Sequence, residues 1–270
     1  MTEMFGEERR LAILDMANQS RVVRVEDLSQ RFGVSVSTVR RDLNDLTRQG
    51  LLRRTYGGAM LSRRESWELP RSERARQQRS AKEQIGILAA QLVRDGETII
   101  VDSGTTTFAL ARWLVGKRNV TVVTNDLRIA IELSSREGVR VLVTGGFVSP
   151  AHDLLVGMAA ERLLGEVNAD RVFLATTGIT LERGATHASA EQLAIKRAMV
   201  KAAQEVVLVA DSSKVGRVQS FQVAPLADLH VLITDCGVPA GFVSAAQAAG
   251  LRVLLAQSGG TRGQADGQSG

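Results

Sequence analysis

Two spacings of hydrophobic residues divide the chain into a short helical part and a longer part in which strands and helices alternate. In the first sixty residues apolar positions recur every three to four residues, which is the helical period. This spacing predicts a helix over about 6–18, a short connection at 21–24, and two further helices. The second helix ends at Gly33 and the third begins at Ser35, since glycine favours a helix end and serine a helix start.

The third predicted helix, which ends at Gly50, has one apolar face and one polar face. Val39, Leu43 and Leu46 fall at i, i+4 and i+7, so they form one buried stripe. The opposite face carries groups that hydrogen-bond to phosphates and base edges, and residues near a helix start reach the major groove first. The candidate DNA-binding residues of this segment are Ser35, Ser37, Thr38, Arg40, Arg41, Asn44 and Arg48.

The segment LLRRTYGGAM after Gly50 predicts a β-hairpin, because two short runs flank the pair Gly57-Gly58. Arg53 and Arg54 on this hairpin are candidates for contact with phosphate or the minor groove. Turn, cap, polar helix face and hairpin follow one another in the order of a winged helix-turn-helix. The alternative is a three-helix domain whose arginines are merely solvated. The order favours double-stranded DNA as a partner.

From about residue 84 short β-branched runs alternate with helical stretches. Such alternation predicts an α/β domain of three layers, α/β/α, with a mainly parallel sheet that helices cover on both faces. The runs lie at 97–102, 119–124, 139–144, 170–176, 205–210, 229–234 and 251–256. The domains predicted are a winged helix-turn-helix at 1–60, a charged linker at 61–82, the α/β domain at 83–256 and a disordered tail at 257–270.

Polar and small residues follow several of these runs, at the edge of the sheet where ligands of such folds bind. A glycine and three hydroxyls after the first run suit an anion, because free amides at a helix start attract negative charge. A lysine near an aspartate after the fifth run suits a phosphate or sugar hydroxyls. Each feature also has a plain explanation as a cap, a turn or a surface ion pair. The candidate ligand-binding residues are Asp102, Gly104, Thr105, Thr106, Thr107, Asn125, Gly145, Gly146, Asp211 and Lys214.

Composition narrows the function. The net charge of +5 lies within residues 1–80, which hold 16 Arg against 11 Asp plus Glu, and this favours a polyanionic partner for that part. Cys236 is the only cysteine and the three histidines are scattered, so neither a metal nor a cofactor is expected. No apolar stretch approaches the roughly 18 residues of a membrane span. The first ten residues are charged, unlike a signal peptide, so a cytoplasmic location is expected.

Both parts resemble one protein family. ERRLAIL, VEDLSQRFGVSVSTVRRDL and RQGLLRRTYGGAML resemble the DeoR-type helix-turn-helix, whose pattern is VSxxTxRRDL followed by GLLxRxxGGA. DGETIIVDSGTTT, VTND, LVTGG, FLATTGIT, IKRAM and VLVADSSKVGR resemble the C-terminal sensor domain of the same family. The resemblance implies a sensor fold similar to ribose-5-phosphate isomerase and CoA transferases.

The resemblance also implies a function. It suggests a sequence-specific transcriptional regulator, a repressor of sugar or carbohydrate genes that is controlled by a phosphorylated sugar or related metabolite and acts as a homo-oligomer, either dimer or tetramer. Lys82 and Lys196 match family positions, and Lys196 suits a helix surface equally well. Many members have a basic residue near Val148 and a glutamate at Gln192, so the chain departs from the family there. The alternatives are a sugar-phosphate isomerase with a DNA-binding appendage and an adaptor that no longer binds DNA, but an enzyme is not expected.

Overall fold

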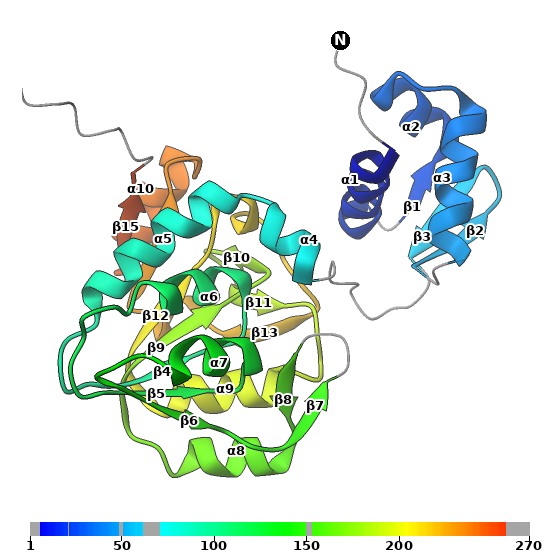
Figure 1. Cartoon of the computed structure of the whole chain (residues 1–270). Helices are drawn as coiled ribbons and strands as arrows, with labels where there is room; N and C mark the ends of the chain where they lie inside the picture. The colour runs from blue at the N-terminus through cyan, green and yellow to red at the C-terminus, as the bar shows by residue number, and fades with distance from the viewer. Residues whose placement is uncertain (1–5, 21, 49–50, 62–70, 150–152, 258–270) are drawn as a thin grey trace, which may run out of the picture. The chain divides into compact units, whose positions relative to one another are not determined.

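The computed structural model describes residues 6–20, 22–48, 51–61, 71–149 and 153–257. The chain divides into two compact units, an N-terminal unit, Met1–Glu68, and a C-terminal unit, Leu69–Gly270. Figure 1 shows the N-terminal unit in blue and the C-terminal unit in cyan to red. Within the described residues no helix is both long enough and apolar enough to cross a membrane.

Three helices and a small antiparallel sheet form the N-terminal unit. The helices are α1 (Gly6–Ser20), α2 (Val25–Phe32) and α3 (Val36–Arg48), and the strands are β1 (Val22–Arg24), β2 (Leu52–Thr55) and β3 (Gly58–Leu61). The strand order is β1-β3-β2. The sequence predicts the β2–β3 hairpin, whereas β1 lies where it indicates only a connection. Val23 of β1 is buried and pairs with Ala59 of β3, which explains the extra strand.

The helix-turn-helix is held by one shared core and by a tight turn. Val39 and Leu43 are fully buried, which confirms the apolar stripe predicted for α3. Between α2 and α3, Gly33 has a φ of 63° and its amide donates to the carbonyl of Ser29. The amide of Val34 donates to the same carbonyl at 3.2 Å. The glycine therefore gives the left-handed helix end that the sequence predicts.

A seven-stranded parallel sheet forms the centre of the C-terminal unit. Its strand order is β15-β14-β12-β9-β4-β5-β6, and every pairing within it is parallel. The strands are β4 (Thr98–Val101), β5 (Val120–Thr124), β6 (Val139–Val143), β9 (Ala169–Ala175), β12 (Ala203–Val209), β14 (Val231–Asp235) and β15 (Arg252–Ala256). The seven predicted β-branched runs thus become the seven strands of one sheet.

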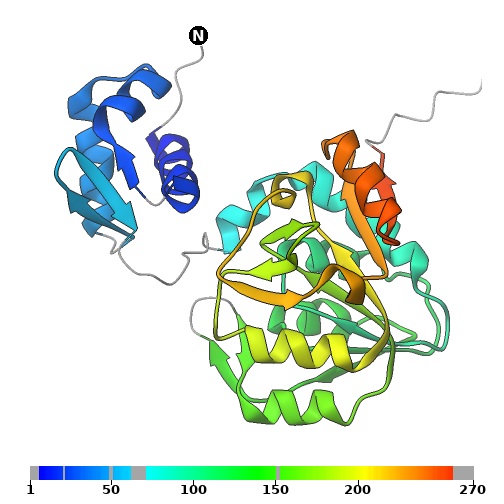
Figure 2. The same cartoon turned by 180° about the vertical axis from the view of Figure 1, so that it is seen from behind.

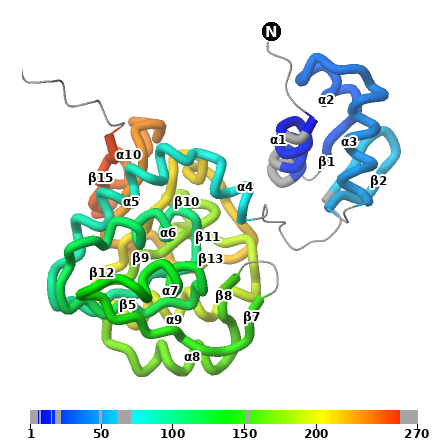
Figure 3. Tube along the Cα trace, viewed as in Figure 1, coloured from blue at the N-terminus to red at the C-terminus, as the bar shows by residue number. Residues whose placement is uncertain are grey.

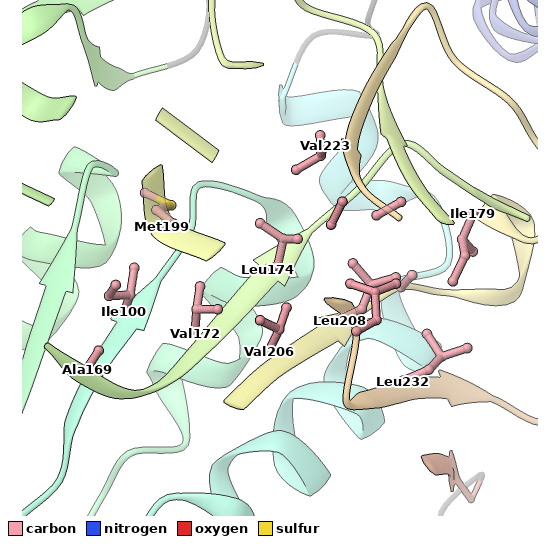
Figure 4. Close-up of a cluster of buried hydrophobic side chains, with 14 of the residues drawn as sticks. Ile100, Ala169, Val172, Leu174, Ile179, Met199, Val206, Leu208, Val223 and Leu232 are labelled. Atoms are coloured by element: carbon pink, nitrogen blue, oxygen red, sulfur yellow. The ribbon is translucent and has the colours of Figure 1, made fainter. Parts of the chain in front are cut away.

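Helices cover both faces of this sheet, as the continuous apolar runs predict. One face packs against α5 (Arg79–Leu92), α6 (Thr105–Arg112) and α7 (Leu127–Ser134) through a core that includes Ile99 and Phe173. The other face packs against α8 (Met158–Gly165), α9 (Leu193–Lys201) and α10 (Ala240–Ala248). Figure 2 shows α8 and α9 from behind, and Figure 4 shows Met199 of α9 beside Val172 and Leu174 of β9.

Two small antiparallel sheets, which the sequence does not predict, complete the unit. One pairs β7 (Phe147–Ser149) with β8 (Leu154–Val156). The other joins β10 (Gly178–Thr180), β11 (Gly184–His187) and β13 (Phe221–Ala224). Two short 3-10 helices, η1 (Ser212–Lys214) and η2 (Leu226–Asp228), lie between strands.

The segment that the sequence assigns to a charged linker, 61–82, is in part helical. Residues 62–70 lie outside the described part of the chain, but α4 (Arg71–Arg76) and the first turn of α5 follow directly. Arg71 and Lys82 are only 7% and 5% exposed, so this segment supplies buried side chains to the C-terminal unit. The sequence did not indicate that these side chains are buried, because a run of charged residues usually indicates a solvent-exposed segment.

Candidate nucleic-acid interface and candidate ligand site

The exposed face of α3 carries most of the residues predicted to bind DNA. Ser37, Arg40, Arg41 and Asn44 are exposed, and they lie opposite the buried stripe of this helix. Among the described residues, Arg40 and Arg41 have no hydrogen-bond or ion-pair partner. Two guanidinium groups on an otherwise solvated helix face are therefore available to a polyanion.

The start of α3 is fixed by hydroxyl groups. Ser35 Oγ accepts from the amide of Thr38 at 3.2 Å, which is an N-cap contact. It also lies 2.7 Å from Ser37 Oγ and 2.9 Å from Thr38 Oγ1. The first role of Ser35 is thus to hold the helix start, and Ser37 and Thr38 share its hydroxyl network.

The last residue of the predicted DNA-binding face is engaged within the protein. Arg48 forms an ion pair with Asp45 one turn earlier, although its side chain is 80% exposed. This pairing neutralises part of the charge at the C-terminal end of α3. The unpaired positive charge of the helix is therefore concentrated at Arg40 and Arg41, near its middle.

A buried ion pair ties α1 to α3. Arg9 Nε donates to Asp42 Oδ2 at 2.6 Å, and Arg10 lies 3.6 Å from the other carboxylate oxygen. Asp42 is 3% exposed and Arg9 is 8% exposed. Asp42 belongs to the RRDL segment, and its neighbours in the sequence are predicted to bind DNA. Its burial shows that this acidic residue orients the helix and does not contact DNA.

The β2–β3 hairpin presents Arg53 and Arg54, which are both exposed. Arg53 Nη2 donates to the thioether of Met60 on the paired strand at 3.3 Å. A Cβ added to Gly58 would lie 2.0 Å from the carbonyl oxygen of Val23, so only glycine allows the close approach of β1. The glycine pair thus serves the turn and the strand pairing, and it leaves the two arginines projecting.

In the C-terminal unit, Asp102 lies in a buried polar group at the carboxyl end of β4. Its Oδ2 accepts from Lys196 Nζ at 2.5 Å and from the amide of Ala175 at 2.9 Å, and its Oδ1 accepts from the amide of Ser103. Burial raises the pKa of Asp102, and Lys196 and the two amides oppose that effect. Lys196 is fully buried, so it has no helix-surface role. Both carboxylate oxygens have partners, which makes Asp102 an organiser of the loop that follows it.

The start of α6 holds the glycine and three hydroxyls that the sequence singles out. Gly104 lies so close to β9 that an added Cβ would be 2.7 Å from Ala175 Cβ. Thr107 Oγ1 donates back to the carbonyl of Gly104 at 3.1 Å, and Thr106 is buried. Thr105 is partly exposed. Because the first amides of a helix have no intrahelical acceptor, this end of α6 can bind an anion.

Two buried acceptors at the same edge have no donor in the described part of the chain. They are Asn125 Oδ1, after β5, and Asp211 Oδ2, after β12. Asn125 Nδ2 donates to the carbonyl of Leu155, and Asp211 Oδ1 accepts from the amide of Ser213, so the remaining oxygen of each is the unsatisfied one. Buried acceptors are nearly always paired, so these two indicate a missing donor.

Lys82 is a residue of this edge that the sequence does not place in the site. Its Nζ donates to the carbonyls of Arg74 and Gln77 and lies 4.0 Å from Asp211 Oδ2. Burial lowers the pKa of Lys82 to about 8, although Asp211 raises it. Lys214 lies in η1, close to Asp211 in the sequence, and is partly exposed. In the sequence, the match of Lys82 to a family position is the feature that could have placed this lysine in the site.

The remaining predicted residues lie at the sheet end near β6. Gly145 and Gly146 have φ values of 72° and 110° and are exposed. A Cβ added to Gly146 would lie 2.4 Å from the carbonyl oxygen of Val156, so this glycine allows β8 to approach. Of the two positions that depart from the family, Val148 is 55% exposed and Gln192 is 4% exposed.

A second buried ion pair joins the ligand edge to α4. Arg71 Nη1 donates to Asp126 Oδ2 at 2.5 Å, and Ser103 Oγ donates to the same oxygen at 2.9 Å. Asp126 Oδ1 accepts from the amides of Arg128 and Ile129 and so caps α7. One carboxylate therefore holds α4, the loop after β4 and the start of α7 together.

Comparison with known proteins gives consistent results for both units. The family model described as a DeoR-like helix-turn-helix domain matches residues 9–65, and the model described as the DeoR C terminal sensor domain matches residues 77–236. The transcriptional repressor GlcR of Bacillus subtilis is 36% identical over 86% of this chain and 89% of its own length. The regulator GolR of Listeria innocua is 32% identical over 94% of this chain and 100% of its own.

The regulator GlpR of Haloferax volcanii is 34% identical over 93% of this chain and 98% of its own. Solved structures are less similar. Ribose 5-phosphate isomerase A of Methanocaldococcus jannaschii has a TM-score of 0.37 at 16% identity over 50% of this chain and 53% of its own. Translation initiation factor eIF-2B of Pyrococcus horikoshii has a TM-score of 0.42 at 17% identity over 84% and 86%.

These three curated relatives are named as transcriptional regulators, not as enzymes. The isomerase likeness is too weak to argue for catalysis. The sensor-domain model alone covers more than half of the chain, and the curated relatives match it over most of their length. The chain belongs to the DeoR family and is a DNA-binding transcriptional regulator.

Proposed function

We propose that the protein is a repressor of sugar or carbohydrate genes that a phosphorylated sugar or a related metabolite controls. The observation that carries this proposal is the pair of buried acceptors, Asn125 Oδ1 and Asp211 Oδ2, that receive no hydrogen bond in the described part of the chain. A buried acceptor without a donor is costly, and sugar hydroxyls are donors that satisfy it. The names of the relatives GlcR and GlpR are consistent with this kind of regulation.

The phosphoryl group of the effector needs positive charge at the same edge. The free amides at the start of α6 beside Thr105–Thr107, together with Lys214, supply it. Asp102 acts through Lys196 and the adjacent amides, because its own oxygens are already occupied. Gly145 leaves the rim near β6 open, since a Cβ added there would meet no other atom within 4 Å. The effector thus spans a hydroxyl-binding and an anion-binding part.

DNA binding belongs to α3 and the β2–β3 hairpin. The exposed Arg40 and Arg41 enter the major groove, while Arg53 and Arg54 contact phosphates beside it. Operators of helix-turn-helix proteins have two half-sites about one helical turn apart, so we propose that the protein acts in the cytoplasm as a homo-oligomer, a dimer or a tetramer. Sedimentation velocity measures that state directly.

Control of DNA binding follows from the ion pair at Asp126. A ligand at the loop after β4 alters the contact of Ser103 with Asp126, and Asp126 holds Arg71 at the start of α4. Arg71 is the first described residue of the C-terminal unit after the connecting segment. A coupling of about 1–3 kcal/mol between ligand and DNA changes DNA affinity roughly 5- to 150-fold.

The test begins with a thermal-shift screen of the full chain against phosphorylated sugars and polyols. A ligand at a hundredfold excess over Kd raises the free energy of unfolding by about 2.7 kcal/mol. Asp211→Asn abolishes the shift in this proposal, whereas Asp228→Asn, exposed in η2, retains it. Fluorescence anisotropy with an operator selected from random DNA then measures whether the ligand releases DNA. If no phosphorylated sugar stabilises the protein, or if the stabilising one leaves DNA affinity unchanged, the proposal is wrong.

A further inference from the structure

A cavity of about 300 Å³ lies between α4, the start of α5 and one side of α6. Figures 1 and 3 show α5 running beside α6, with α4 at one end of the pair. Thr105, Phe108 and Arg112 from one face of α6 line it. Thr105 also belongs to the effector site proposed above, and Lys82, another lining residue, lies 4.0 Å from Asp211 Oδ2 of that site. The basic residues of its lining are Arg71, Arg76, Arg79, Lys82, Arg112 and Arg128.

The positive charge of this cavity is only partly compensated. Among the lining residues that the structure describes, Glu83 is the one carboxylate, and it pairs with Arg112 at 3.3 Å. Arg128 pairs with Asp153 outside the cavity at 2.6 Å. Arg76 and Arg79 are exposed and have no hydrogen-bond or ion-pair partner within the described ranges. A concave surface with such an excess of cations attracts a compact anion.

Arg71 lines this cavity and has one donor without a hydrogen-bond partner in the described part of the chain. It is 7% exposed, and its Nη1 is bound to Asp126. Its Nη2 is buried and has no acceptor in the described part of the chain. The guanidinium plane lies 5.7 Å from the centre of the Phe108 ring, which fixes its orientation. A buried cationic donor without an acceptor is unfavourable unless a ligand provides one.

The start of α6 adds a second attraction for the same kind of ligand. α6 has eight residues, and Thr105, its first, lines the cavity. The amides of the first helical turn and the helix dipole favour negative charge there. Phe108 and Ala109 form an apolar floor beside this end. The volume lies at the lower limit for small-molecule pockets, so the ligand is small.

We propose that this cavity is a second anion site, which binds the phosphoryl group of a small phosphorylated molecule through Arg71, Arg76 and Arg79. This site borders the effector site at the start of α6, but it is centred on the arginines of α4 and α5, whereas Asn125 and Asp211 belong to the effector site. A duplex DNA backbone does not fit, because Arg71 lies buried inside the cavity. An anion bound to Arg71 joins α4 to α6. It therefore stabilises α4, which is the first described element of the C-terminal unit.

Isothermal titration of the full chain with pyrophosphate tests this proposal. The double variant Arg76→Ala/Arg79→Ala removes the two unpaired arginines without disturbing a buried contact. We expect its affinity for pyrophosphate to fall at least tenfold. The matched control is Arg94→Ala/Arg252→Ala, which removes the same charge from exposed positions elsewhere in the C-terminal unit and keeps the affinity within twofold.

Two further variants separate this site from the effector site. Arg71→Lys keeps a cation beside Asp126 but removes the second donor, so it weakens pyrophosphate binding. Lys214→Ala leaves pyrophosphate binding unchanged. The proposal is overturned if the wild type does not bind pyrophosphate, if Arg76→Ala/Arg79→Ala binds it normally, or if Lys214→Ala or the control pair weakens binding equally. None of these results bears on whether a sugar phosphate binds at Asp211.

Discussion

Replacing Lys82 with methionine removes a buried charge and stabilises the C-terminal unit at neutral pH. Lys82 is 5% exposed, and burial lowers its pKa from 10.5 to about 8. Each pKa unit corresponds to about 1.4 kcal/mol, so keeping the ammonium charged at pH 7 costs the folded state up to about 3 kcal/mol. This is an upper bound, because a methionine cannot form the hydrogen bonds to the carbonyls of Arg74 and Gln77 and removes the cation 4.0 Å from buried Asp211.

The sign of the pH dependence follows from the lowered pKa. Between pH 8 and 10.5 the unfolded chain keeps its proton on Lys82 while the folded chain has released it. Stability rises with pH wherever the unfolded state binds more protons, so this lysine contributes a rise across that window. The cost of the buried charge is complete below about pH 8 and has disappeared above pH 10.5.

Urea unfolding of the full chain at pH 7, 8, 9 and 10 measures this contribution. Trp113 fluorescence in a Trp67→Phe background reports on the C-terminal unit, because Trp113 lies just after α6 and donates to Glu83. We expect the wild type to gain stability relative to Lys82→Met as the pH rises from 7 to 10. Lys201→Met, an exposed control in α9, follows the wild type. If the free energy of unfolding changes with pH in the same way in the wild type and in Lys82→Met, the inference that Lys82 carries a buried charge is wrong.

Three further results are expected for the N-terminal unit. Arg41→Ala relaxes discrimination at one base position of the operator by about 1–3 kcal/mol, measured by competition between operator variants. Arg53→Ala and Arg54→Ala weaken binding to all sequences and reduce the slope of log Kobs against log salt by about 0.9 for each phosphate that the protein no longer neutralises. Asp42→Ala removes the buried carboxylate that pairs with Arg9 and destabilises this unit by about 3–5 kcal/mol in thermal unfolding followed by circular dichroism.

Hydrophobic spacing predicts the framework of this fold because the framework depends on it. The runs that become β4 and β9 are apolar on both faces, and Ile99 and Ile100, on opposite faces of β4, belong to two separate cores. The helical stripe of α3 works in the same way, since Val39 and Leu43 must face α1 and α2. In each case many weak apolar contacts act together, so the local spacing of hydrophobic residues is enough to predict the element.

The short antiparallel strands escape prediction for the opposite reason. β1 has three residues, and only Val23 within it is buried. Its existence depends on the register with β3 and on Gly58, which leaves room for the carbonyl of Val23. β7 and β8 likewise depend on the close approach at Gly146. Pairings of this kind are set by the tertiary structure, so three residues of sequence carry too little pattern to show them.

Buried cations are the features of the site that sequence reasoning finds hardest. Arg71 and Lys82 stand in a run of charges, and Lys196 stands on an amphipathic helix, so each reads as solvated. Their burial depends on acceptors far away in the chain, namely Asp126 for Arg71 and Asp102 for Lys196. A carboxylate at a strand end predicts a ligand edge, but it does not show which cation will satisfy it. The position of the ligand edge is therefore predictable from the sequence. The structure is needed to tell which cations pair with carboxylates of the protein and which can pair with a ligand.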